Sequence, residues 1–247
     1  MARKAKHSDP AEAIAEIESM GEQAIEWIGE NAKVVLSVVV ICLLLAGGYG
    51  YFDAVKTRRE NAASEALAEI RDGYLMAMGA SPGALEVPES ADPAAAGAVR
   101  QEYGERFEAV AQEYPGTAGA AIARLEQGNL VAAAGDEAGA IEIWRAAIAR
   151  LSGSSPLAGV LHQRIGQALE SAEDWEAAAE AYEAAAAIGA YTFRHWAMAD
   201  AVRCYLMADR PEKALEHSAR LESEAPALQL PDYLRARLRE LSVANPG

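Results

Sequence analysis

Four histidines are the side chains best suited to bind a metal ion or to transfer a proton: His7, His162, His195 and His217. His162 and His195 fall near the starts of two predicted helices in successive helix pairs, so they could lie close together. A metal site also needs further ligands, and carboxylates that orient the imidazole rings. Because no such carboxylate pattern accompanies these histidines, ordinary polar surface or groove positions are favoured over a metal centre.

Other sequence signals of catalysis are weak. The HExxH, CxxC and Walker-loop motifs are missing, and acidic residues are so abundant that no acid–base pair stands out. Cys42 lies in an apolar run and Cys204 in a predicted helix far along the chain, which favours free thiols over a disulfide. The sequence therefore predicts no cofactor, no metal and no enzymatic activity.

Composition indicates an all-α protein of 247 residues with a formal net charge of −15. Alanine, the strongest helix former, recurs in runs, and few segments show the period-2, β-branched pattern of strands. Residues 53–247 alone carry 18 basic and 30 acidic residues, a net charge of −12. A surface this acidic repels phosphate backbones, so nucleic acid is excluded as an expected partner.

An uncharged run of residues, 34–52, is predicted to be a single transmembrane helix. Nineteen helical residues span about 28 Å, close to the thickness of a bilayer's hydrocarbon core. Tyr49, Tyr51 and Phe52 suit the membrane interface. A buried soluble helix and a signal peptide cleaved near Ala46 or Gly48 are the alternatives; the long acidic lead favours an uncleaved anchor. Basic residues are balanced across the run, so charge alone does not orient it.

The lead before this run, residues 1–33, contains a predicted amphipathic helix at 11–30. Its apolar stripe comprises Ile14, Ile17, Ala24 and Ile28, and it could bind a partner or lie along the membrane. Within the apolar run, Ala46 and Gly50 form one small-xxx-small pair, which is weak evidence for helix association.

After the membrane segment, the sequence predicts a membrane-proximal helix at 53–78 and a loop rich in proline and glycine at 79–97. A repeat domain is expected at 98–226, and a capping helix with a short tail at 227–247. Three segments repeat a helix–turn–helix pattern: 122–148, 160–186 and 196–221. The fold class is therefore an N-terminal transmembrane helix followed by an α-solenoid.

The repeats are similar to the tetratricopeptide repeat, in which small and large residues occupy fixed positions. Small residues recur at Ala140, Ala178 and Ala214, while Trp144 and Tyr182 are expected to fill space against the next repeat. In such a solenoid the first helices line a concave surface. The repeat register places eight residues on that surface as the expected protein-binding site: Leu125, Asn129, Gln163, Gln167, Trp196, Ala199, Arg203 and Met207.

Some tetratricopeptide domains bind a C-terminal carboxylate through lysine and asparagine at set positions. The matching positions here hold Leu125, Asn129, Arg164 and Trp196, so only part of that clamp could form.

The order of segments resembles the YfgM family of ancillary subunits of the bacterial Sec translocon. The resemblance rests on 28–33 leading into the apolar run, the helix at 58–67, Phe107 to Ala109, Tyr114 to Thr117 and the closing 234–241. The insertion at 79–97 and the N-terminal extension depart from the family pattern. The resemblance implies a bacterial inner-membrane protein with a cytoplasmic N-terminus and a periplasmic repeat domain. It also implies two partners, Sec translocon subunits and a periplasmic chaperone of the prolyl-isomerase type. A general adaptor for cell-envelope assembly or division is the alternative.

Overall fold

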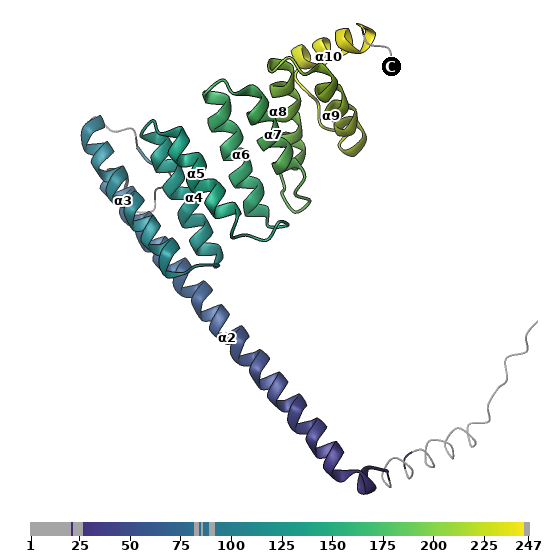
Figure 1. The fold of residues 1–247 in the computed structure, drawn as a ribbon. Helices are drawn as coiled ribbons and strands as arrows, with labels where there is room; N and C mark the ends of the chain where they lie inside the picture. Colours follow the sequence, from purple (N-terminus) through teal and green to yellow (C-terminus); the bar gives the residue numbers. More distant parts are fainter. Residues whose placement is uncertain (1–20, 22–26, 82–83, 85, 89–91, 245–247) are drawn as a thin grey trace, which may run out of the picture. The chain divides into compact units, whose positions relative to one another are not determined.

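A computed structural model describes residues 21, 27–81, 84, 86–88 and 92–244 (Figure 1). Every regular element in this described part of the chain is an α-helix, which confirms the predicted all-α class. The chain divides into two compact units, Met1–Arg58 and Arg59–Gly247. Most of the amphipathic helix predicted at 11–30 lies outside the described residues, including Ile14, Ile17 and Ala24.

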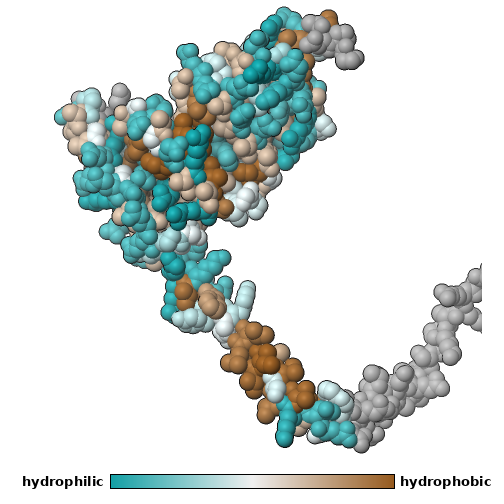
Figure 2. Space-filling view, in the orientation of Figure 1, coloured by the Kyte–Doolittle hydropathy of each residue, from teal (hydrophilic) through white to brown (hydrophobic). Residues whose placement is uncertain are grey.

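Helix α2, Ala32–Ala77, contains the whole apolar run at 34–52. Large apolar side chains along this run are not covered by other residues of the protein, and Leu44 is 70% exposed. In Figure 2 the same stretch of α2 is hydrophobic on the surface that faces the viewer. A soluble core helix would be covered by neighbours, whereas none of the most apolar window of α2 is buried. Among the described residues, α2 is the one helix long and apolar enough to cross a membrane.

The end of α2, from Arg59 onward, belongs to the second unit. Leu67, Ile70 and Tyr74 on this end pack against a buried cluster that includes Tyr103 and Phe107 of helix α3, Pro93–Glu113. Residues 59–77 of the predicted membrane-proximal helix at 53–78 therefore form the first helix of the first helix pair.

The loop between α2 and α3 is shorter than the sequence indicated. Helix α3 begins at Pro93, so residues 93–97 are helical and not part of a loop that ends at 97. The Asp92 carboxylate accepts hydrogen bonds from the N–H groups of Ala94 and Ala95. Proline at the first helical position after an aspartate N-cap is a strong start signal, and the alanines that follow propagate the helix.

The remaining helices form three consecutive hairpins and a final single helix. Their bounds are α4 Ala118–Ala133, α5 Glu137–Ile148, α6 Pro156–Ser171, α7 Trp175–Ala186, α8 Arg194–Met207, α9 Pro211–Glu224 and α10 Asp232–Ala244. Each helix packs against the next along the chain. This arrangement of stacked helix pairs confirms the predicted solenoid of tetratricopeptide type.

The turns inside the three hairpins are equivalent and make the repeat visible in the backbone. Gly135, Glu173 and Asp209 each adopt a positive φ, of 91°, 59° and 56°. In the first two turns the next residue, Asp136 or Asp174, accepts a hydrogen bond from the first turn of the following helix. Glycine adopts a left-handed conformation without penalty, whereas Glu173 and Asp209 adopt it at some cost in backbone strain.

Matched small and large residues join the two helices of each hairpin. A Cβ atom on Gly128 would lie 2.1 Å from Nε1 of Trp144, and one on Gly166 would lie 2.8 Å from the ring of Tyr182. Both rings also belong to clusters with the next repeat, as the sequence predicted. In the third hairpin the equivalent positions hold Val202 and Ser218, both buried. The larger residue of this pair is therefore on the first helix and the smaller one on the second, the reverse of the other two hairpins.

Helix α10 follows the hairpins and begins at Asp232, the start that the sequence predicted. Leu234 and Leu238 on α10 are buried in the same cluster as Leu221 of α9. The helix therefore covers the apolar face that the last hairpin would otherwise leave open.

Candidate protein-binding groove

The first helices of the three hairpins, α4, α6 and α8, form an inner layer. Helix α4 contacts α6 directly, and α6 contacts α8. In the described part of the chain the second helices, α5, α7 and α9, make no contact with one another of similar extent. Closer spacing of the first helices is the geometry of a solenoid whose concave side they line.

The α4–α6 groove is an open hollow of about 400 Å³ between the first two of these helices. Its lining residues are Asn129, Ala132, Glu137, Trp144, Arg164, Gln167, Ala168 and Ser171. Two of the residues predicted from sequence, Asn129 and Gln167, are thus placed in it. Its polar groups are two amides, one guanidinium, the Glu137 carboxylate, the Ser171 hydroxyl and the Trp144 indole N–H. The amides suit hydrogen bonding to a polypeptide backbone.

The α6–α8 groove, of about 310 Å³, is lined by Val160, Gln163, Arg164, Gln167, Tyr191 and Phe193. It shares Arg164 and Gln167 with the α4–α6 groove, so the two hollows adjoin at these residues of α6. Arg164 Nη1 donates to Gln167 Oε1 at 3.1 Å, and no carboxylate among the described residues forms an ion pair with it. The Tyr191 hydroxyl donates to Gln163 Oε1.

Sequence reasoning missed Tyr191 and Phe193, which follow α7 in the connection to α8. Tyr191 lies on Gly159 of α6, where a Cβ atom would be 2.4 Å from its ring. Phe193 is 57% exposed, and its ring packs edge-on against Tyr191. The sequence signal for this pair is Gly159 on α6, a small residue that leaves room for an aromatic ring from the connection between α7 and α8. Only the packing in the structure shows that Tyr191 occupies this room.

Arg203, also predicted for the binding surface, is held by carboxylates of its own domain. Its guanidinium donates to both carboxylate oxygens of Glu170 on α6, at 2.8 Å for Oε2, and to Asp200 at 3.2 Å. The Tyr182 hydroxyl donates to Glu170 at 3.0 Å. We call Glu170, Tyr182, Asp200 and Arg203 the Glu170 network. Arg203 is half-buried and engaged in it, so it is not free to bind a partner.

The Glu170 network shifts the ionisation of its members. The hydrogen bond from Arg203 holds the pKa of the Glu170 carboxyl below its usual value. Burial raises the pKa of Tyr182 and of Asp200. Burial also raises the pKa of the neighbouring Cys204 thiol to about 12, so this cysteine is a protonated core residue and not a nucleophile.

The other predicted residues divide between surface and core. Trp196 is 56% exposed and Met207 is 57% exposed, so both present apolar surface to solvent on α8. Ala199 is buried in the core between α7, α8 and α9, contrary to its predicted place on the surface. Leu125 is half-buried against the α5–α6 cluster, and its carbonyl accepts a hydrogen bond from Trp144 Nε1 at 3.2 Å. The repeat register therefore predicted Ala199 and Leu125 to be more exposed than the structure shows them to be.

Of the four positions compared with a carboxylate clamp, Asn129 and Arg164 line the α4–α6 groove, while Leu125 is packed. Trp196 is exposed on α8. A complete clamp is therefore not formed by these residues.

The histidines have separate surroundings. His195 accepts a hydrogen bond from Arg194 and lies 3.6 Å from Glu224. Burial lowers the pKa of His162 on α6. His217 is buried, stacks on Tyr205 and lies 3.5 Å from Glu183. Within the described ranges, no group of three or more His, Cys, Asp or Glu side chains is placed to hold a metal ion.

Residues 79–83 read Gly-Ala-Ser-Pro-Gly, which has the letters of the GxSxG motif of serine hydrolases. That motif functions on a sharp strand-to-helix turn with a histidine base nearby. Ser81 instead follows the end of α2 and is exposed. The letters of the motif are therefore present without its structural setting.

Comparison with known proteins found no matching family model and no matching curated protein. Among solved structures, the chain is similar to crystal structures of nearly identical tetratricopeptide-like repeats of a kinesin light chain from Podosopora anserina. One of these and a variant of it with a single substitution each match with a TM-score of 0.45 and 18% identity. The matches cover 60% of this chain, and 80% and 79% of the two repeat chains.

Proposed function

We propose that this protein is a membrane-anchored, non-catalytic scaffold that binds an extended segment of another protein in the groove along α6, which comprises the adjoining α4–α6 and α6–α8 grooves. The observation that carries the proposal is the composition of this groove. Side-chain amides at Asn129, Gln163 and Gln167 can pair with the amides of a bound backbone. Phe193 and Val160 offer apolar contact for side chains of that segment.

The groove also contains a charge that a partner can match. Arg164 lies where the two hollows join, and its guanidinium pairs with an amide and with no carboxylate of the described chain. In a chain of net charge −15, such a guanidinium in a groove favours a segment with an acidic side chain at that point. Trp196 and Met207 are further exposed apolar side chains on α8, and tryptophan is enriched at the energetic centres of interfaces.

The proposed setting is the bacterial inner membrane, with α2 as a single-pass anchor, a cytoplasmic N-terminus and a periplasmic repeat domain. The proposed partners are Sec translocon subunits and a periplasmic chaperone of the prolyl-isomerase type. This assignment is supported by the resemblance in segment order to the YfgM family, together with the bare apolar stretch of α2. A reporter fused after Gly247 tests the orientation, because a reporter active only in the cytoplasm would contradict a periplasmic domain.

Site-specific photo-crosslinking in cells tests the groove. A photo-reactive residue in place of Phe193 is expected to capture partner proteins, while one in place of the exposed Arg145 on α5 is expected not to. Capture of Sec subunits or the chaperone at position 193 supports the proposed setting. Capture of other envelope proteins there supports the general adaptor instead. Equal capture at both positions would show that the groove has no special role.

A further inference from the structure

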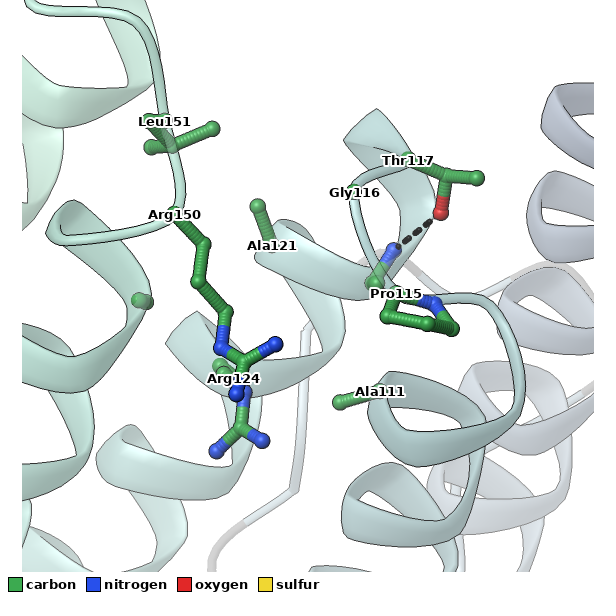
Figure 3. A pocket seen from close by; sticks show the side chains of 10 residues that line it. Ala111, Pro115, Gly116, Thr117, Ala121, Arg124, Arg150 and Leu151 are labelled. Carbon is green, nitrogen blue, oxygen red and sulfur yellow. Dashed lines mark hydrogen bonds between the residues drawn. The ribbon is translucent and has the colours of Figure 1, made fainter. Parts of the chain in front are cut away.

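A small pocket near the N-terminal end of α4 is lined by two arginines (Figure 3). Arg124 comes from α4, and Arg150 directly follows α5. In Figure 3 the two guanidinium groups lie on one side of the pocket, and Ala111, Pro115 and Gly116 lie on the opposite side. This pocket is separate from the groove along α6, because the two share no lining residue.

The two arginines of this pocket find no ion-pair partner among the described residues, in contrast to several other arginines of the domain. Across the described residues, no hydrogen bond or ion pair joins the guanidinium of Arg124 or Arg150 to an acceptor. Other arginines of the domain do find carboxylates, such as Arg106 with Glu102 and Arg210 with Glu176. Two like charges on one side of a pocket repel each other without an anion, so this arrangement favours binding of an anion between them.

The dimensions of the pocket limit what the anion can be. Its volume is about 20 Å³. A single water molecule occupies about 10–15 Å³ measured in this way, so the pocket admits one or two oxygen atoms. Enclosed sites for soluble metabolites are commonly hundreds of Å³. The pocket therefore fits an oxyanion presented from outside, with the bulk of its molecule beyond the opening.

The charge of the site comes from the arginines. At the start of α4, two of the first three N–H groups already have acceptors, because Ala118 N donates to Glu60 Oε2 at 2.9 Å and Ala120 N donates to Thr117 Oγ1. Arginine binds phosphate oxygens in a bidentate manner, and two guanidiniums supply enough donors for one phosphate group.

The hydrogen bond from Ala118 N to Glu60 also connects the pocket to a residue that lies close in sequence to the apolar run. Gly119, next to the pocket, packs so tightly on Ala63 that a Cβ atom there would lie 2.8 Å from the Cβ of Ala63. Glu60 follows Phe52, the end of the apolar run, by eight residues, which span at most about 29 Å in any conformation. Lys56, Arg58 and Arg59 lie within those residues. This short connection limits how far the pocket can be from the end of the apolar run, which raises the effective concentration of the pocket at the lipid surface.

We propose that Arg124 and Arg150 bind the phosphate group of an anionic phospholipid headgroup. The inference rests on the membrane anchor of the proposed function and is independent of the groove that binds protein. Contact with a headgroup would attach an acidic domain, through two arginines, to a membrane surface that otherwise repels it.

The test uses the full chain in nanodiscs of phosphatidylcholine, with or without phosphatidylglycerol, followed by amide hydrogen exchange. With the anionic lipid we expect exchange at residues 115–124 and 147–151 to slow about tenfold, the change given by a ligand at ten times its dissociation constant. Arg124→Gln/Arg150→Gln should abolish that slowing. The matched control, Arg100→Gln/Arg239→Gln, removes the same charge from two other arginines and should retain it.

Each other outcome would overturn the proposal. Exchange that responds to inorganic phosphate in neutral detergent, but not to phosphatidylglycerol, would assign the site to a soluble anion. Equal loss in the control variant would indicate general charge attraction, and no response at all would remove the site. Failure of the anchor shows separately as failure to enter nanodiscs, and failure of the groove as failure of crosslinking at position 193.

Discussion

Arg164 and Arg203 lie on neighbouring helices of the same inner layer, yet one faces an open groove and the other is bound within the domain. Arg164 is hydrogen-bonded to the Gln167 amide, whereas Arg203 is bound by Glu170 and Asp200. The difference arises because Glu170 lies near the end of α6, within reach of α8, while no carboxylate of the described residues pairs with Arg164. A positive charge on a concave surface is therefore a binding candidate only where the adjacent repeat supplies no acid.

This contrast predicts that the bound region contributes strongly to stability and the open region hardly at all. The largest effect is expected for Tyr182→Ala, because the Tyr182 ring is 2% exposed and closes on Gly166. We expect the free energy of unfolding to fall by about 3–5 kcal/mol. Denaturant unfolding of the full chain in mild detergent measures it. Tyr182→Phe, which loses only the hydrogen bond to Glu170, should cost about 1 kcal/mol, and equal costs for the two variants would contradict the packing.

A smaller loss is expected for Glu170→Gln, which removes the main charge partner of Arg203. The substitution should lower the free energy of unfolding by about 1–3 kcal/mol, because a half-buried guanidinium keeps only Asp200. Glu142→Gln is the matched control, since Glu142 pairs with Arg145 on an exposed surface. Its cost should stay below about 1 kcal/mol. If both variants cost the same, the Glu170 network is no more than a surface ion pair.

The same network predicts a pH dependence with a definite sign. The pKa of Glu170 in the folded protein is held below its ordinary value of 4.5, so its contribution to stability is present above about pH 4.5. As the pH falls below that value and through the lower folded pKa, the contribution is lost. The difference in unfolding free energy between the unmodified chain and Glu170→Gln should shrink over this range. A difference that stays constant down to acid denaturation would argue against the carboxylate of Glu170 as its source.

The smallest effect on stability is expected for Arg164→Ala. Its side chain is exposed and bonded to a neighbouring amide, so the free energy of unfolding should change by less than about 0.5 kcal/mol. Partner capture at position 193 should nevertheless fall if Arg164 pairs with an acidic side chain of the bound segment. Undiminished capture would restrict the groove's role to its amide and aromatic contacts.

Much of the fold could be predicted from local pattern. The alanines at 140, 178 and 214 are fully buried, the turns recur at the same place in each hairpin, and the last helix begins at Asp232, because helical periodicity and start signals act within a few residues. The predicted loop at 79–97 was too long, because the composition of that segment outweighed the start signal at Asp92 and Pro93.

The candidate site could be predicted only in part. Asn129, Gln163 and Gln167 follow from the repeat register and do line the groove. The partnership of Arg203 with Glu170 joins residues 33 positions apart, and the placement of Phe193 depends on how Tyr191 packs on Gly159. Such pairings depend on the distance and rotation between helices, which residue spacing within one helix does not contain.

The matched residue pairs between the helices of each hairpin limit how these repeats can be exchanged. Gly128 with Trp144 and Gly166 with Tyr182 put the bulk on the second helix, whereas Val202 with Ser218 puts it on the first. A chimaera that joined α8 to α7 as one hairpin would press a valine against Tyr182, and one that joined α6 to α9 would leave a hole between glycine and serine. Whole hairpins, and not single helices, are therefore the interchangeable modules for anyone who shortens or extends this solenoid.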